Sequence, residues 1–263
     1  EKVRKNVRKI MDFEHVKAVF EEYLNGYDRE NDKVKLKIVH TYGVIRCSEE
    51  IGRRMGLQAE DMELAKLIAL LHDIGRFEQL KRFNSFEADT MDHATYGVQV
   101  LFEEGMIRQF IEEDTWDDVI RTAIAKHSDY ELTGITDERT LLHARLIRDA
   151  DKLDNCRVKL EDAMETLLDL SADEVGKYAI SPKVREDAFA GKCICSKDRR
   201  TPMDYWVSYV AYFYDLNFRE TLDIVAEEQY VKRIIGRVPY TNEQTKKTME
   251  ELERQLTEYV RRK

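Results

Sequence analysis

Proline is scarce in this chain of 263 residues, and it is unevenly placed. Only Pro182, Pro202 and Pro239 occur, so the first 181 residues contain none. Proline inside a helix removes a hydrogen bond and clashes with the preceding turn, so its absence permits long helices. Apolar residues in this stretch recur at helical spacing, with short breaks near single glycines. We therefore predict an all-α fold.

Cysteine is also rare. The four cysteines, at positions 47, 156, 193 and 195, do not resemble a disulfide framework in a chain of this length. Cys193 and Cys195 form a C-x-C pair that lacks the two-residue gap of a usual zinc knuckle and has no second pair. We therefore expect free thiols in a reducing, cytoplasmic compartment.

The chain lacks both a basic excess and a long apolar run. Its formal net charge of −9 argues against binding of a nucleic-acid duplex, because a phosphate backbone needs a basic footprint. A small phosphorylated substrate, held by a few local cations, stays compatible with this charge. No stretch approaches the roughly 18 apolar residues of a membrane span, so we expect no membrane partner. The opening segment EKVRKNVRKIM lacks the apolar core of a secretory signal.

Helical periodicity predicts a series of helices along the chain. Their expected ranges are 12–25, 33–56, 60–73, 89–105, 115–128, 138–155, 158–170, 181–190, 203–217, 219–227 and 241–261. Residues 191–202 are the most irregular segment and are expected to form a long loop or a short hairpin. A soft boundary falls near residues 156–180.

Four of the six histidines lie on apolar helix faces. His40 begins an apolar stripe, and His72-Asp73 ends the apolar run of LIALLHDIGRFEQ, residues 67–79. His93, His127 and Asp151 also align with apolar residues on their own helices. A single buried histidine is more often a hydrogen-bonded core residue than a ligand. One bundle that buries four imidazoles and two carboxylates needs partners for all of them, and a pair of divalent metals provides these economically.

The order of these residues resembles the HD superfamily of metal-dependent phosphohydrolases. The resemblance covers roughly residues 30–155 and is carried by KIVHTYGVIRCSEEIGRRMGL, ALLHDIGRFEQ, MDHATYGVQVLFEEG, TAIAKHSDYEL and LIRDADKLDN. It implies one metal held by His40, His72, Asp73 and Asp151, and a second held by His93 and His127, with Asp73 bridging. The two extra histidines are similar to those of the dinuclear subgroup. AKHSDYEL is not followed by Gly-Tyr-Pro, which departs from the HD-GYP branch that hydrolyses cyclic dinucleotides.

The resemblance also implies the architecture and the chemistry. We expect an HD-type metal-binding helical core with an N-terminal helix in residues 1–155. A C-terminal helical extension, residues 156–263, is expected to pack on it and resembles the tail of bacterial HD-domain proteins of unassigned substrate. The implied reaction is hydrolysis of a phosphomonoester or phosphodiester bond, with a nucleotide as the favoured substrate, by a metal-activated water at a dinuclear centre. Mixed nitrogen and oxygen ligands suit Fe, Mn, Co, Ni or Zn better than Mg, and the resemblance favours Fe or Mn.

Several cations lie close in sequence to the expected ligands. We predict catalytic roles for Asp73, Arg76 and Lys152, and substrate contacts for Arg76, Lys126, Lys152 and Arg199, since guanidinium and ammonium groups bind phosphate. Arg148 is predicted to be a surface cation. Gly75 is interpreted either as a sharp turn that serves Arg76 or as a helix C-cap.

Two other functions stay open at this point. The same His, His-Asp, His, His, Asp pattern is similar to that of HD-fold di-iron oxygenases such as inositol oxygenase and phosphonate-cleaving oxygenases, which act on small polar substrates. A nucleotide sensor without catalysis is a third interpretation, and the complete ligand set argues against it. The oligomeric state is left open.

Overall fold

The computed structural model describes residues 11–262. The opening segment, which was expected to lack a secretory signal, lies outside these residues except for Met11. Within these residues every regular element is helical, which confirms the all-α prediction. The α-helices are α1 Phe13–Leu24, α2 Asp32–Met55, α3 Ala59–Leu71, α4 Ile74–Phe83, α5 His93–Val98, α6 Ile107–Phe110, α7 Asp117–Lys126, α8 Glu138–Glu161, α9 Met164–Leu168, α10 Ala172–Val175, α11 Pro182–Phe189, α12 Pro202–Ala211, α13 Arg219–Glu227, α14 Tyr230–Ile235 and α15 Glu243–Arg262.

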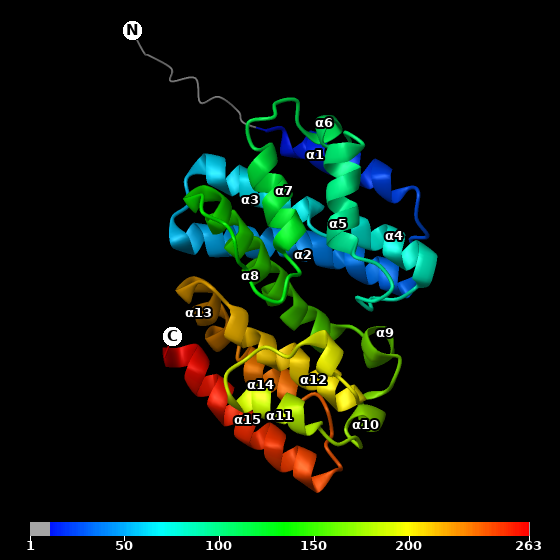
Figure 1. Cartoon of the computed structure of the whole chain (residues 1–263), viewed down its shortest axis with the longest axis vertical. Helices are drawn as coiled ribbons and strands as arrows, with labels where there is room; N and C mark the ends of the chain where they lie inside the picture. Colours follow the sequence, from blue (N-terminus) through cyan, green and yellow to red (C-terminus); the bar gives the residue numbers. More distant parts are fainter. Residues whose placement is uncertain (1–10, 263) are drawn as a thin grey trace.

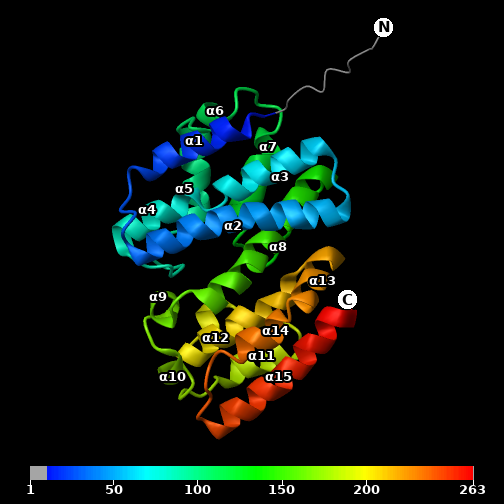
Figure 2. The ribbon, with the colours of Figure 1, turned by 180° about the vertical axis from the view of Figure 1, so that it is seen from behind.

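The helices form two groups that share α8. Helices α1 to α7 make up the upper group in Figure 1, α9 to α15 make up the lower group, and α8 runs from one to the other. The long helix α2 packs against α3 and α8, and α7 packs against α8. Seen from behind, α15 runs along the outer side of the lower group (Figure 2). The division expected after residue 155 falls inside α8, so both parts of the chain contribute to one continuous helix.

Local capping explains where the two longest site helices begin. The side chain of Asn31 accepts hydrogen bonds from the backbone amides of Lys33 and Val34, which starts α2. Asp137 does the same for α8 through the amide of Thr140. Helix α2 ends at Met55 and is capped by Gly56, whose φ of 71° is left-handed and suits glycine. These caps, together with buried apolar residues along both helices, set the register of the polar residues between them.

The sequence-based prediction missed α4. A break was expected at Gly75, but α3 ends at Leu71 and α4 begins at Ile74, so the chain turns at His72 and Asp73 instead. Gly75 lies in the first turn of α4 and is no C-cap. A Cβ atom there would lie 2.1 Å from the carbonyl oxygen of His93. Glycine is required because α4 and α5 approach closely at this point.

Other departures are smaller. Helix α14 was not predicted, and α8 continues to Glu161 where a break was expected after residue 155. Segment 191–202 is irregular as expected, and it contains one short 3₁₀ turn, Ser196–Asp198, and no hairpin. Within residues 11–262, none of the helices has the length and apolar character needed to cross a bilayer.

Candidate metal centre and substrate cleft

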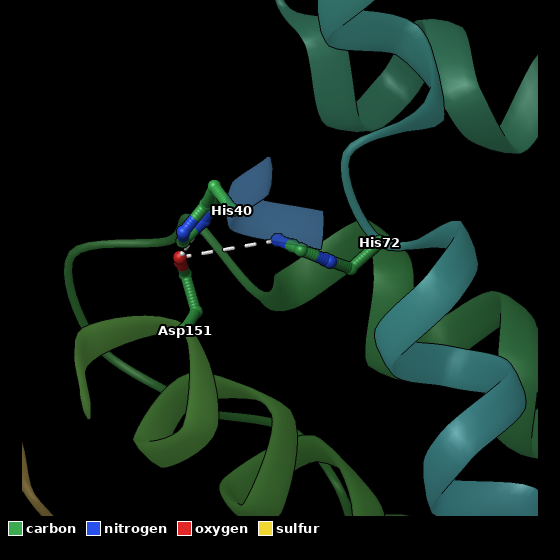
Figure 3. Close-up of side chains that lie close together, drawn as sticks. All are labelled: His40, His72 and Asp151. Atoms are coloured by element: carbon green, nitrogen blue, oxygen red, sulfur yellow. Dashed lines mark hydrogen bonds and ion pairs between the residues drawn. The ribbon is translucent and has the colours of Figure 1, made fainter. Parts of the chain in front are cut away.

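The six residues predicted to bind metal meet at one place in the upper part of the molecule. They come from α2 (His40), the turn between α3 and α4 (His72 and Asp73), the start of α5 (His93), the end of α7 (His127) and α8 (Asp151). Figure 3 shows that His40 and His72 point toward the carboxylate of Asp151. The Oδ1 atom of Asp151 lies 3.0 Å from His40 Nε2 and 3.9 Å from His72 Nε2.

Asp73 lies between the two halves of this cluster. Its Oδ2 atom is 3.6 Å from His72 Nε2, and its Oδ1 atom is 3.3 Å from His93 Nε2 and 3.4 Å from His127 Nε2. Two groups of three residues have ligand atoms within 4.8 Å of one another. They are His40, His72 and Asp151, and His72, Asp73 and His127. Each group could hold a metal ion, and the two groups share His72.

Hydrogen bonds to the outer ring nitrogens fix the orientation of two of the histidines. His72 Nδ1 donates to the carbonyl of Ala69 at 2.7 Å, and His127 Nδ1 donates to the carbonyl of Ile124 at 2.7 Å. A carbonyl only accepts, so Nδ1 of each ring carries a proton, and Nε2 of each ring faces the cluster. Burial lowers the pKa of His72 to about 4 and that of His93 to about 3, so both rings are neutral near pH 7.

His40 is oriented by a carboxylate that sequence reasoning missed. Its Nδ1 atom lies 2.8 Å from Oδ2 of Asp154, which is 3 % exposed. Arg157 holds this carboxylate with two hydrogen bonds of 3.0 and 2.9 Å. A Cβ atom on Gly43 would lie 2.0 Å from Oδ1 of Asp154, so the glycine makes room for the carboxylate. The available signal was spacing, because Asp154 follows Asp151 by three residues on the same helix.

Asp154→Asn is expected to weaken metal binding about 10- to 100-fold while the protein stays folded. The amide is a poorer acceptor for His40, so the ring is less firmly oriented and less basic, and losses of this size are typical of such partners of metal-binding histidines. Metal content after dialysis against graded chelator concentrations measures the effect. Asp173→Asn, at an exposed position on α10, is the matched control. Equal metal retention by the two variants would contradict the orienting role of Asp154.

The donor set fits a divalent transition metal. The Nε2 atom of His72 is buried and has no hydrogen-bond partner among the described residues, which is costly for a nitrogen in a protein interior. Burial acts to raise the pKa of Asp73, but Lys37 and the neighbouring histidines hold it well below its usual range. Burial also acts to raise the pKa of Asp151, but the hydrogen bond with His40 holds this pKa well below its usual range. Ionised carboxylates facing the neutral rings of His72 and His93 are ligands that Fe, Mn, Co, Ni and Zn accept.

Comparison with known families agrees with this geometry. Residues 38–156 match the family model described as "HD domain". The chain contains an HD domain. Ribonuclease Y of Acetivibrio thermocellus is 30 % identical to it over 165 residues, which cover 60 % of this chain and 27 % of that protein. The chain thus spans only about a quarter of the length of this relative. No solved structure matches the chain.

A cleft of about 390 Å³ opens beside the ligand cluster of the HD domain. Its lining comes from both parts of the chain. Helices α2, α4 and α8 contribute to it, and so do α12 and the segment before α12. Among the predicted substrate contacts, Arg76, Lys152 and Arg199 line this cleft. Lys126 does not line it, and its ammonium group lies 3.6 Å from the carboxylate of Asp129.

The cleft cations have different partners. Lys37, which sequence reasoning missed although it lies three residues before His40 on α2, is 2.7 Å from Asp73 Oδ2. Lys152 pairs with Asp215 at 2.8 Å. The guanidinium of Arg199 lies 4.1 Å from the ring centroid of Tyr205. Positive charge therefore surrounds the anionic ligand cluster on several sides.

Arg76 lies at the inner end of the cleft and is held in place by its neighbours. Its Nη1 atom donates to Gln79 Oε1 at 2.6 Å, and Nη2 lies 3.0 Å from His93 Nε2. The fully buried Gln79 donates in turn to the carbonyl of Glu87 and the hydroxyl of Thr90. Gln79 thereby ties Arg76 to the loop that leads into α5.

Arg148 was predicted to be a surface cation, and this prediction is wrong. The residue is only 2 % exposed. Its Nη1 atom donates to the carbonyls of Lys126, His127 and Asp129, and Nη2 donates to Asp215 at 2.6 Å. These carbonyls lie at the end of α7 or just beyond it, where helix carbonyls lack internal partners. Arg148 thus fixes the turn of the HD domain that carries His127.

Proposed function

We propose that this chain is a metal-dependent phosphohydrolase that cleaves a phosphomonoester or phosphodiester bond of a nucleotide at a dinuclear centre in the cytoplasm. The observation that supports this most is the convergence of four imidazole Nε2 atoms and two carboxylates beside a cleft lined by lysine and arginine. Such a cleft attracts a phosphorylated substrate despite the net negative charge of the chain.

Two adjacent ions are proposed, one held by His40, His72, Asp73 and Asp151 and the other by His93 and His127, with Asp73 between them. Divalent ions held there would lower the pKa of a bound water and stabilise charge on a phosphoryl oxygen. Fe or Mn is the preferred identity under this proposal, with Zn, Ni and Co as further candidates.

Cationic side chains that line the cleft are proposed to bind the phosphate of the substrate. Arg76 is 14 % exposed, lies at the inner end of the cleft, and can present two N–H groups to phosphoryl oxygens. Lys152 neighbours Asp151 in sequence, and Arg199 approaches from the opposite part of the chain. Lys37 lies against Asp73 and limits the negative charge that an incoming phosphate meets.

Aromatic residues that line the cleft support a nucleotide rather than a simple phosphate ester. Phe86, Tyr205, Tyr209 and Tyr212 line the cleft, and rings of this kind stack on bases without strong base preference. The relative found by comparison is named Ribonuclease Y, which is consistent with a phosphodiester substrate.

The decisive experiment combines metal analysis with a substrate screen. Protein purified without chelators is analysed for bound metal and then assayed with nucleoside mono-, di- and triphosphates, cyclic nucleotides and short oligoribonucleotides. We expect release of phosphate or a nucleoside monophosphate that stops on chelation and returns with Mn²⁺ or Fe²⁺. Turnover that requires oxygen, or nucleotide binding without hydrolysis in any metal, would contradict the proposal.

A further inference from the structure

Lys159 lines the cleft at a distance from the metal ligands and has unusual surroundings. The residue is 6 % exposed, and its ammonium group lies 3.8 Å from the ring centroid of Tyr212 and 4.9 Å from that of Tyr209. Its own carbonyl accepts a hydrogen bond from Arg237, which helps to fix the backbone at this point. The amine is therefore held between two aromatic rings at the edge of the cleft.

Lys159 differs from the other lysines of the cleft in having no carboxylate partner. Lys37 pairs with Asp73, and Lys152 pairs with Asp215. Across residues 11–262, no hydrogen bond or ion pair involves the ammonium group of Lys159. Buried charges are normally paired, because their desolvation is expensive. An unpaired amine beside a cleft is suited to an anion that arrives with the substrate.

The position of Lys159 defines a distance from the reaction centre. Asp151, Asn155 and Lys159 follow one another at four-residue spacing on α8, and all three line the cleft. Eight residues of helix separate Asp151 from Lys159, so their Cα atoms lie about 12 Å apart along the axis, and the lysine side chain leans back over part of this distance. A group bound at Lys159 is therefore offset along the cleft from a phosphate held beside the metal ligands.

We propose that Lys159, with the rings of Tyr209 and Tyr212, binds a second phosphate of the substrate. This inference rests on the proposed function and specifies its substrate class. The two phosphates of a pyrophosphate group share one bridging oxygen, which is too short a link for this separation. A sugar between the phosphates provides a longer link. The substrate class is therefore a nucleotide phosphorylated on both sides of one sugar, as in a nucleoside 3′,5′-bisphosphate or an oligonucleotide.

The electrostatics agree with this assignment. Burial lowers the pKa of Lys159 to about 7, because an ammonium ion is poorly solvated there. A bound phosphate favours the charged amine and offsets this effect. Tyr209 and Tyr212 add attraction for the cation while leaving its N–H groups available to the ligand.

Equilibrium binding tests the proposal without depending on catalysis. The probes are the 3′,5′-bisphosphates of adenosine and uridine, compared with the corresponding 5′- and 3′-monophosphates. Titration calorimetry at pH 6.5 is run on the protein as purified and again after chelation, which stops metal-dependent turnover. We expect at least one bisphosphate to bind about tenfold more tightly than either of its monophosphates, a difference of about 1.4 kcal/mol.

Lys159→Met is expected to reduce this preference to less than about threefold, because methionine fills similar space without a charge. Lys247→Met, at an exposed position on α15, is the matched control and is expected to retain the full preference. Equal binding of bisphosphates and monophosphates by the unmodified protein would overturn the proposal even if Lys159→Met did not fold. A preference that survives in a folded Lys159→Met variant would also overturn it.

The outcome separates this inference from the proposed hydrolase activity. A preference that depends on Lys159, in a protein that hydrolyses nothing in any metal, would support the second phosphate site and contradict the hydrolase. Nucleotide hydrolysis without the bisphosphate preference would support the hydrolase and overturn the second site.

Discussion

Asp73→Asn is expected to lower kcat/KM at least about 1000-fold, equivalent to about 4 kcal/mol of transition-state stabilisation. Asp73 approaches three histidine Nε2 atoms within 3.6 Å, so its carboxylate contributes to both proposed cation positions. An amide has nearly the same shape but no charge. The substitution therefore removes the charge that balances two cations while leaving the volume of the side chain unchanged.

The measurement pairs steady-state hydrolysis of the best substrate in the nucleotide screen with metal analysis of the same sample. Asp173→Asn is the matched control because this aspartate is exposed on α10, away from the site. We expect the Asp73 variant to lose at least one equivalent of metal per chain relative to the control. Activity within tenfold of the control would show that Asp73 does not bridge the centre.

Arg148→Met is expected to lower the free energy of unfolding by about 3–5 kcal/mol, since it leaves several carbonyls without their buried donor and removes one of the two cations that pair with Asp215. For a chain of this size the melting temperature should fall on the order of 10 °C. The three carbonyls involved lie at the end of α7 or just beyond it, and one of them belongs to His127. The loss of packing around this turn should also weaken metal binding.

Urea unfolding of the metal-free protein separates the stability effect from any change in metal affinity. Arg254→Met, at an exposed site on α15, is the matched control and should change stability by less than about 0.5 kcal/mol. Arg148→Lys should recover only part of the loss, because an ammonium group cannot reproduce the planar fork that reaches both the carbonyls and Asp215. A stable Arg148→Met variant would contradict the buried role.

The all-α class was predictable because helical periodicity and the lack of proline extend over long stretches. Element boundaries were less predictable near the site. Helix α4 was missed because Gly75 was interpreted as a break, whereas its small size serves contact with α5. That contact joins residues far apart in sequence, and no local pattern reveals it.

The roles of the cations depended even more on distant partners. Arg148 looked like a surface residue in a highly charged chain, yet it is buried by carbonyls of α7 and by Asp215. Lys126 adjoins His127 in sequence but does not line the cleft. Lys159 gave no signal by itself, and its importance follows from the two tyrosines of the C-terminal part that enclose its amine.

The sequence by itself determined the helical class, the HD domain and the identity of the six candidate metal ligands. Those features are encoded in local periodicity and in the order of a few chemically distinctive residues. Only the tertiary structure decided that the six side chains meet, how Asp154 orients His40, and which cations face the cleft. The physical reason is that burial and pairing of a charged group depend on neighbours from other helices, and these are set by packing of the whole chain.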